Sequence, residues 1–164
     1  RNPLVKRVVA YTTRPPREGE VDGEDYHFIT KAEFIEKADA GDFLEWKEVH
    51  GNLYATPLAD MEAMLEKGLV AVLKIDVQGA IDVMRLRPEA ISIMLKPPTW
   101  EELERRTRSR GSDSEEVIAQ RLSNARGELA LAHHYAYTVI NDDVERCVDE
   151  IEGILSHHGV NEPV

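Results

Sequence analysis

The apolar positions of this chain fall into short runs that are separated by segments with helical spacing. Short apolar or alternating runs of this kind are typical of strands. They predict strands at residues 5–10, 26–29, 43–49, 53–56, 69–75, 91–95 and 137–140. The run 69–75 is almost continuously apolar, which is typical of a strand buried on both faces.

Capping signals between these runs predict the helices. The capping-box spacing of Ser or Thr to Glu occurs three times, at Thr30-x-x-Glu33, Thr99-x-x-Glu102 and Ser112-x-x-Glu115. Thr56-Pro57 has the residue types favoured at the N-cap and first turn of a helix. We therefore expect helices at 30–40, 57–68, from 99 onward, from 112 to about 134, and at 143–157.

The order of these elements predicts an α/β fold. Strands that alternate with helices imply a parallel sheet with helices on both faces. Residues 11–68 differ, because they are strand-rich and contain a hairpin turn at His50-Gly51-Asn52, and they predict a small lobe inserted into the core. Ligands of such folds bind beyond the carboxyl ends of the parallel strands. Three polar residues follow predicted strands there: Arg14, Asp76 and Asn141.

Composition narrows the classes of function. The 164 residues fit one domain, and the net charge of −11 disfavours nucleic acid and anionic membranes as partners. No apolar run is long enough to cross a bilayer. The single cysteine, Cys147, fits a reducing compartment and packing in the last helix, so we expect a cytoplasmic protein. The six histidines lack metal-ligand spacing, and we expect no metal held by the protein alone.

The first candidate for chemistry is the segment Thr12-Thr13-Arg14-Pro15-Pro16-Arg17. Its prolines exclude a helix interior. Arginines held at a strand exit can bind a phosphate group bidentately, which an acidic protein achieves only through such a local cluster. The alternative is a solvated loop that carries two surface arginines.

The second candidate is Glu45, which lies in an apolar strand where a carboxylate needs a hydrogen-bond donor. The adjacent N1–H and N2–H groups of guanine are such donors; the Thr56 hydroxyl is placed to donate to O6, and Tyr54 to contact a phosphate or stack. The alternative is an exposed Glu on an edge strand. Asp76, after the run 69–75, is predicted to orient Mg²⁺ or a base, to cap the next helix, or both.

The third candidate is a group of arginines between residues 105 and 121. Arg106 and Arg110 share a helix face, and Arg121 lies in the next predicted helix. A turn between the helices directs these three toward one point, where arginines stabilise a transferring phosphoryl group. The alternative, a solvated face paired with glutamates, explains Arg105 and Arg108 well.

These motifs occur together in one order, and together they resemble the guanylate kinase family. The resemblance covers about residues 8–143. It rests on the occurrence of many motifs in the same order along the chain. The motifs are Thr12-Thr13-Arg14-x-x-Arg17-x-Gly19-Glu20, Gly23-x-Asp25-Tyr26-x-Phe28, Phe43-Leu44-Glu45-Trp46, Gly51-Asn52-x-Tyr54-x-Thr56, Ile75-Asp76-Val77-Gln78-Gly79, Pro97-Pro98, Arg108-x-Arg110-Gly111 and Ile140-Asn141-Asp142-Asp143.

The resemblance implies an enzyme that uses ATP and Mg²⁺ to phosphorylate GMP, giving GDP and ADP, as a monomer or homodimer. It assigns the GMP site to Arg14, Arg17, Tyr26, Glu45, Tyr54, Thr56 and Asp76. It assigns the ATP phosphates to a lid with Arg106, Arg110 and Arg121, which with Arg14 form the catalytic set, and adenine to Asn141. It implies a P-loop NTPase-like core at 1–10, 69–104 and 124–164, a GMP lobe at 11–68 and a lid at 105–123.

Three departures qualify the resemblance. No glycine precedes a lysine, so G-x-x-x-x-G-K-[ST] is absent; we expect that loop upstream of Arg1 and expect residues 1–164 alone to be inactive. Ala10 stands where the family has serine, and Lys74 where it has an acid. The competing function is a non-catalytic module of this fold that binds a protein or peptide; the three lid arginines favour the enzyme.

Overall fold

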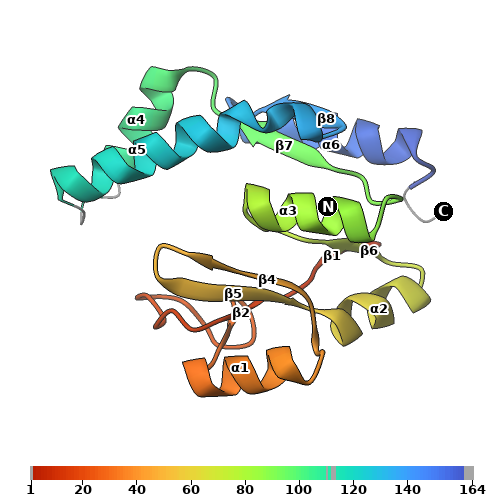
Figure 1. The fold of residues 1–164 in the computed structure, drawn as a ribbon. Coiled ribbons are helices and arrows are strands. Elements are labelled where there is room, and N and C mark those ends of the chain that lie inside the picture. The colour runs from red at the N-terminus through yellow and green to blue at the C-terminus, as the bar shows by residue number, and fades with distance from the viewer. Residues whose placement is uncertain (1, 110, 112–113, 161–164) are drawn as a thin grey trace. The chain divides into compact units, whose positions relative to one another are not determined.

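The computed structural model describes residues 2–109, 111 and 114–160. Its contacts divide the chain into two compact units, the first ending at Pro88 and the second beginning at Glu89 (Figure 1). The strand-rich segment 11–68 therefore shares a unit with residues 2–10 and 69–88. The finer division into core, lobe and lid stays a prediction.

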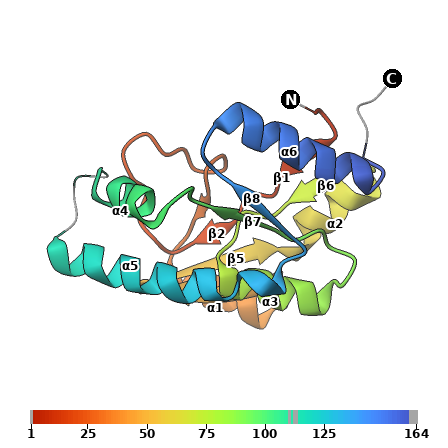
Figure 2. The ribbon, with the colours of Figure 1, turned by 90° about the horizontal axis from the view of Figure 1, so that it is seen from above.

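The first unit contains six strands and three helices. These are β1 (Val5–Arg7), β2 (Tyr11–Thr12), β3 (His27–Phe28), α1 (Lys31–Asp39), β4 (Phe43–Val49), β5 (Asn52–Pro57), α2 (Leu58–Glu66), β6 (Val70–Val72) and α3 (Val77–Leu86). β1 and β6 form a parallel pair, and the lobe strands form a sheet in the order β3-β2-β5-β4. α2 packs beside β6 (Figure 2).

The predicted hairpin is confirmed as β4 and β5, which pair antiparallel from Val49 and Asn52 at the turn to Phe43 and Pro57. The turn consists of His50 (φ 51°) and Gly51 (φ 82°). Two successive residues with positive φ produce a tight turn whose twist matches that of the strands, and glycine adopts this conformation without strain.

The two faces of the hairpin meet different helices, because side chains alternate along a strand. On one face Phe34 of α1 is fully buried with Leu53 and Ala55, and the Trp46 ring lies 5.8 Å from it. On the other face, Lys47 forms a 2.7 Å ion pair with Asp82 of α3. α1 and α3 thus flank the hairpin on opposite sides (Figure 1).

The described residues of the second unit form two strands and four helical segments. These are β7 (Ile93–Lys96), α4 (Trp100–Ser109), α5 (Glu115–Ala130), the 3-10 helix η1 (Ala132–His134), β8 (Tyr137–Ile140) and α6 (Val144–His157). β7 and β8 are parallel, with Ile93 opposite Tyr137. Parallel strand pairs joined through helices confirm the predicted α/β class. Cys147 is buried in α6, as predicted.

Three of the predicted helix starts are confirmed. Thr30 and Glu33 form the reciprocal capping box of α1. The Thr99 hydroxyl accepts the Glu102 N–H at 3.0 Å, and Asp143 caps α6 through the Arg146 N–H. No helix among the described residues combines the length and the apolar character needed to cross a bilayer.

Three predictions of local structure were wrong. β6 covers only Val70–Val72, and Val72 is 38% exposed rather than buried on both faces. Pro57 rather than Thr56 is the N-cap of α2, because the Thr56 hydroxyl hydrogen-bonds to Glu45 instead. α5 is capped by Ser114 and ends at Ala130, short of the predicted end at 134; Ser112 lies outside the described residues.

Candidate functional site

The first unit contains a pocket of about 260 Å³ between the lobe sheet and the segment that follows β6. Four of the predicted site residues line it: Tyr26, Glu45, Tyr54 and Asp76. Ala10 and Lys74, two of the three departures from the family pattern, line it as well. Four of the seven side chains that sequence reasoning assigned to one ligand therefore come together here from separate segments, whereas Arg14, Arg17 and Thr56 are not among the described residues that line the pocket.

Two carboxylates form the acidic end of this pocket. Glu45 is 9% exposed, and its Oε1 accepts a 2.9 Å hydrogen bond from the Thr56 hydroxyl. Asp76 is the N-cap of α3, where its Oδ1 accepts the Gly79 N–H at 3.2 Å. The capping role considered for Asp76 is confirmed, and it leaves the same side chain on the pocket wall.

Burial raises the pKa of Glu45, and the nearby Asp76 and Asp82 carboxylates raise it further, while the Thr56 hydrogen bond opposes both. A buried carboxylate of this kind gains most from a ligand that brings N–H donors, because its charged form lacks solvation. β4 is an edge strand of the lobe sheet, as the alternative for Glu45 had it, but Glu45 is buried there, so the exposed placement was wrong.

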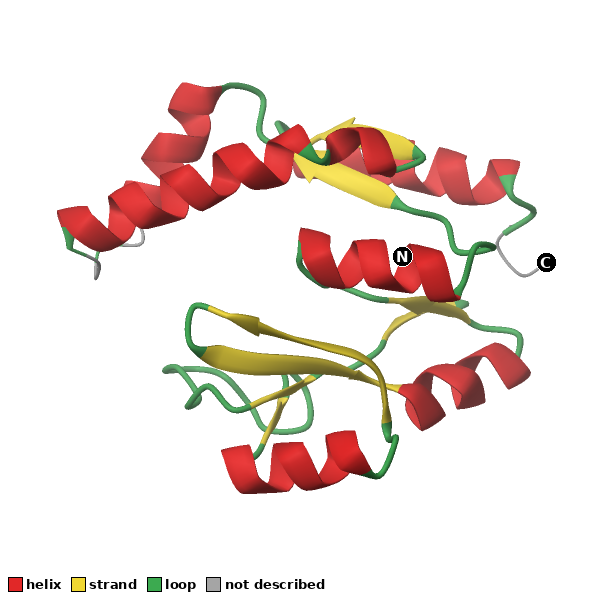
Figure 3. Cartoon of the chain, viewed as in Figure 1, coloured by secondary structure: helices red, strands yellow, loops and turns green. Residues whose placement is uncertain are grey.

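Arg14 lies in the loop of residues 13–26 that joins β2 to β3 (Figure 3). Its guanidinium binds Glu20 with both nitrogens, Nη1 to Oε1 at 2.8 Å and Nη2 to Oε2 at 3.0 Å. Glu20 raises the pKa of Arg14, and the Tyr54 oxygen contributes as well. The Arg17 residue is exposed, and its backbone N–H, not its guanidinium, donates to Glu20 Oε1 at 2.7 Å.

Aromatic rings connect Arg14 to the pocket. The guanidinium lies 5.4 Å from the centre of the Tyr26 ring, and this ring meets that of Tyr54 edge-on at 5.9 Å. Arg14 is 10% exposed, so the guanidinium is held rather than free to move in solvent. The surface-arginine alternative was therefore wrong for Arg14, while the exposed Arg17 side chain matches it.

Sequence reasoning missed the role of Glu20, although it lies in the quoted motif. An acid three residues beyond Arg17 in a loop restrained by prolines was the available signal. It also assigned no role to Gly79, which lies inside α3 three residues after Asp76.

In the second unit, Arg106 contacts Asn141, and both residues are predicted to contact ATP. Its Nη2 donates to the Asn141 carbonyl at 3.0 Å, and its Nε donates to Glu102 at 2.8 Å. Arg121 lies in α5, and Arg110 lies outside the described residues. The convergence of the three lid arginines on one point stays a prediction.

The other arginines of this region have structural partners. Arg105 pairs with Glu102, and Arg108 with Glu104 and Glu115, which confirms the alternative of a solvated, ion-paired face. The Arg126 guanidinium lies 4.2 Å from the centre of the Trp100 ring, a contact that sequence reasoning missed. A flat guanidinium stacks better than an ammonium group, which explains an arginine at 126.

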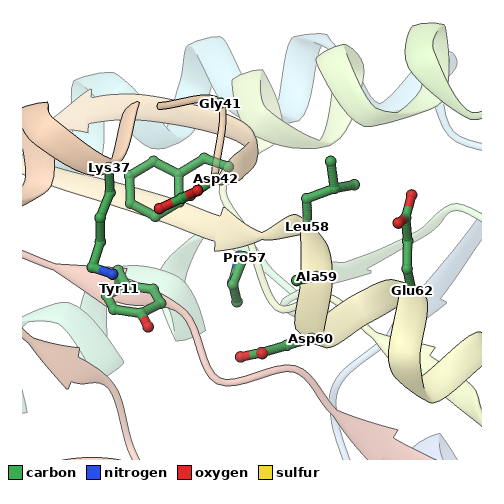
Figure 4. Close-up of a pocket in the computed structure, with 10 residues that line it drawn as sticks. Tyr11, Lys37, Gly41, Asp42, Pro57, Leu58, Ala59, Asp60 and Glu62 are labelled. Atoms are coloured by element: carbon green, nitrogen blue, oxygen red, sulfur yellow. The ribbon is translucent and has the colours of Figure 1, made fainter. Parts of the chain in front are cut away.

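A second hollow of about 380 Å³ lies in the first unit, among Tyr11, Lys37 and Asp42 and the start of α2 (Figure 4). The Lys37 ammonium lies 5.2 Å from the centre of the Tyr11 ring. None of the described residues that line this hollow is a predicted site residue. Four of the predicted site residues line the smaller pocket instead.

Comparisons with known proteins point to one family. A family model described as guanylate kinase matches residues 4–158. A guanylate kinase of Chromobacterium violaceum is 50% identical over 144 residues, which are 88% of this chain and 69% of that protein. A guanylate kinase of Nitratidesulfovibrio vulgaris is 48% identical over 143 residues, which are 87% of this chain and 69% of that protein.

A solved structure gives the same answer. The crystal structure of guanylate kinase from Anaplasma phagocytophilum matches with a TM-score of 0.84 and 34% sequence identity, covering 96% of this chain and 78% of that chain. The buried Glu45 beside Asp76, the held Arg14 and these matches lead to one conclusion: the chain belongs to the guanylate kinase family.

Proposed function

We propose that the 260 Å³ pocket of the first unit is the GMP site through which this chain performs the reaction of its family, transfer of the γ-phosphoryl group of ATP to GMP to give GDP and ADP. The observation that carries the proposal is the buried Glu45 carboxylate beside Asp76, facing the same pocket as Tyr26 and Tyr54. A matching ligand has N–H donors at one end, for the Glu45 carboxylate, and negative charge at the other, for Arg14 beside the tyrosines.

Guanine fits the acidic end. Its N1–H and N2–H groups are adjacent donors, and a single carboxylate accepts both. Thr56 has a donor that guanine O6 would share or take over, since in this structure it donates to Glu45. Adenine presents a bare N1 acceptor at the same edge, which a carboxylate repels.

The GMP phosphate fits the arginine end. Arg14 is oriented over the Tyr26 ring, and its two terminal nitrogens bind Glu20 side by side, the geometry in which a guanidinium also binds a phosphate. We assign the phosphate to Arg14, Tyr26 and Tyr54, with Arg17 as an outer contact. Arg14 then acts in catalysis by holding the accepting phosphate in place.

ATP is assigned to the second unit. The hydrogen bond from Arg106 to the Asn141 carbonyl supports a common site for these two residues. Arg110 and Arg121 complete the proposed set that stabilises the transferring phosphoryl group. Mg²⁺ is expected with ATP; among the described residues no three His, Cys, Asp or Glu side chains gather as a metal site requires, so it has no assigned protein ligand.

The guanine assignment is tested with Glu45→Gln. The amide keeps the size of the side chain but replaces one acceptor oxygen with a donor, which opposes a guanine N–H. We expect the Kd for GMP, measured by calorimetry, to rise roughly tenfold or more while weak AMP binding changes little. Unchanged GMP affinity in this variant would remove Glu45 from base recognition.

A further inference from the structure

The carboxylates of Glu45 and Asp76 both lie close to a glycine, Gly79, in the first turn of α3. Gly79 is buried, and its backbone is helical rather than left-handed. Glycine is disfavoured within a helix relative to alanine, and here no positive φ requires it. Its presence therefore calls for a steric explanation.

The surroundings of Gly79 supply that explanation. A Cβ atom at this position would lie 2.9 Å from Glu45 Oε2, closer than real Cβ contacts come, and 3.0 Å from Asp76 Oδ1, tighter than most of them. At Gly127 in α5 and Gly153 in α6, the described part of the chain places no atom within 4 Å of such a Cβ. Only the first of these helical glycines lies against charged side chains.

Both carboxylates are held in this place by other bonds. Thr56 fixes Oε1 of Glu45, so that Oε2 is the oxygen directed at Gly79. Asp76 Oδ1 is fixed by the Gly79 N–H. The Lys47–Asp82 ion pair, at 2.7 Å, joins β4 to the next turn of α3. The ion pair anchors the helix, whereas Glu45 Oε2 is the end of a side chain held by the Thr56 hydrogen bond, so a methyl group at 79 would displace that carboxylate more readily than the helix.

We propose that Gly79 is a positioning residue for base recognition: its missing side chain lets the carboxylates of Glu45 and Asp76 approach each other and so sets where the pocket presents its acceptors to a purine. The proposal rests on the proposed function, because it concerns the same GMP site. It adds a residue that touches no ligand but determines selectivity for the 2-amino group of guanine.

The test compares Gly79→Ala with Gly153→Ala, a matched change in an open helical position. Calorimetry with GMP and IMP measures selectivity, since IMP keeps N1–H but lacks the 2-amino group. We expect Gly79→Ala to weaken GMP by about tenfold to a hundredfold and IMP by less, so that the ratio of the two affinities falls. Gly153→Ala should keep both affinities.

A double variant keeps the test valid if Gly79→Ala folds poorly. Glu45→Asp withdraws the carboxylate from the added methyl group, so Gly79→Ala should have a much smaller effect on thermal unfolding in that background than in the parent chain. Equal effects in both backgrounds, or equal weakening of GMP and IMP by Gly79→Ala, would overturn the proposal and leave Gly79 with a general packing role.

The same assay separates this proposal from the one on which it rests. If Glu45→Gln retains the GMP preference over IMP, the guanine assignment itself fails. If Glu45→Gln removes that preference and Gly79→Ala keeps it, only the role of Gly79 fails.

Discussion

Arg14 and Glu20 form a side-on ion pair in which each terminal nitrogen of the guanidinium meets one carboxylate oxygen, at 2.8 and 3.0 Å. The pair fixes the plane of the guanidinium in a loop without regular structure. Because a phosphate binds arginine in the same geometry, Glu20 orients Arg14 for its proposed ligand and also competes with it.

Arg14→Ala should weaken GMP far more than guanosine. The guanidinium acts on the phosphate, and losing its charged hydrogen bonds corresponds to roughly tenfold or more in Kd. Calorimetry with both ligands measures the difference. Equal losses for the nucleotide and the nucleoside would show that Arg14 only supports the loop.

The stability contributed by Glu20 should depend on pH. The hydrogen bonds from Arg14, and then from the Arg17 backbone, lower the pKa of Glu20 to about 2. A carboxyl group with a lowered pKa stabilises the folded state above its ordinary value near 4.5, and this contribution is lost as the pH falls toward 2. Glu20→Gln should thus lower the melting temperature at pH 7, and the difference from the parent chain should shrink at pH 3. A difference as large at pH 3 as at pH 7 would contradict the ionic role.

Glu45 should show the opposite sign. Burial raises its pKa, so the folded protein binds the proton more tightly than the unfolded chain does. Stability without nucleotide should therefore fall as the pH rises above 4.5, and Glu45→Gln should remove that part of the decrease. GMP affinity should rise over the same pH range, since the ionised carboxylate is the better acceptor. Thermal unfolding and calorimetry across pH 4–8 measure both trends; identical stability profiles for the variant and the parent would contradict the account.

Gly153→Ala should stabilise the chain. Gly153 lies within α6, and no described atom would meet the added methyl group. Replacing glycine by alanine in such a helical position raises the free energy of unfolding by about 0.5–1 kcal/mol. Denaturant unfolding measures the change, and a loss of stability would reveal a contact that the structure does not contain.

The sequence predicted those features that depend on neighbouring residues. The capping box of Thr30 and Glu33 satisfies helix N–H groups within one turn, so its pattern is sufficient. The alternation of β4 likewise reflects two faces with different neighbours. The same reasoning found Glu45, because a carboxylate in an apolar strand requires a partner whatever the fold.

Features that depend on distant residues were not predictable in this way. Thr56 is a residue type favoured at helix N-caps, yet its hydroxyl donates a hydrogen bond to Glu45, eleven residues earlier in the chain. Val72 was predicted to be a core residue because its run is apolar, but it is exposed, since exposure depends on which residues pack around β6. The role of Gly79 depends on two carboxylates from separate elements, which no local pattern of glycine reveals.

A crystal structure of the chain with GMP bound tests the central claim most directly. GMP should bind with the N1–H and N2–H edge of its guanine against Glu45, beside Asp76. Its phosphate should lie within hydrogen-bond distance of Arg14, Tyr26 and Tyr54. GMP seated in the larger hollow beside Tyr11 and Lys37, or a phosphate remote from Arg14, would contradict it.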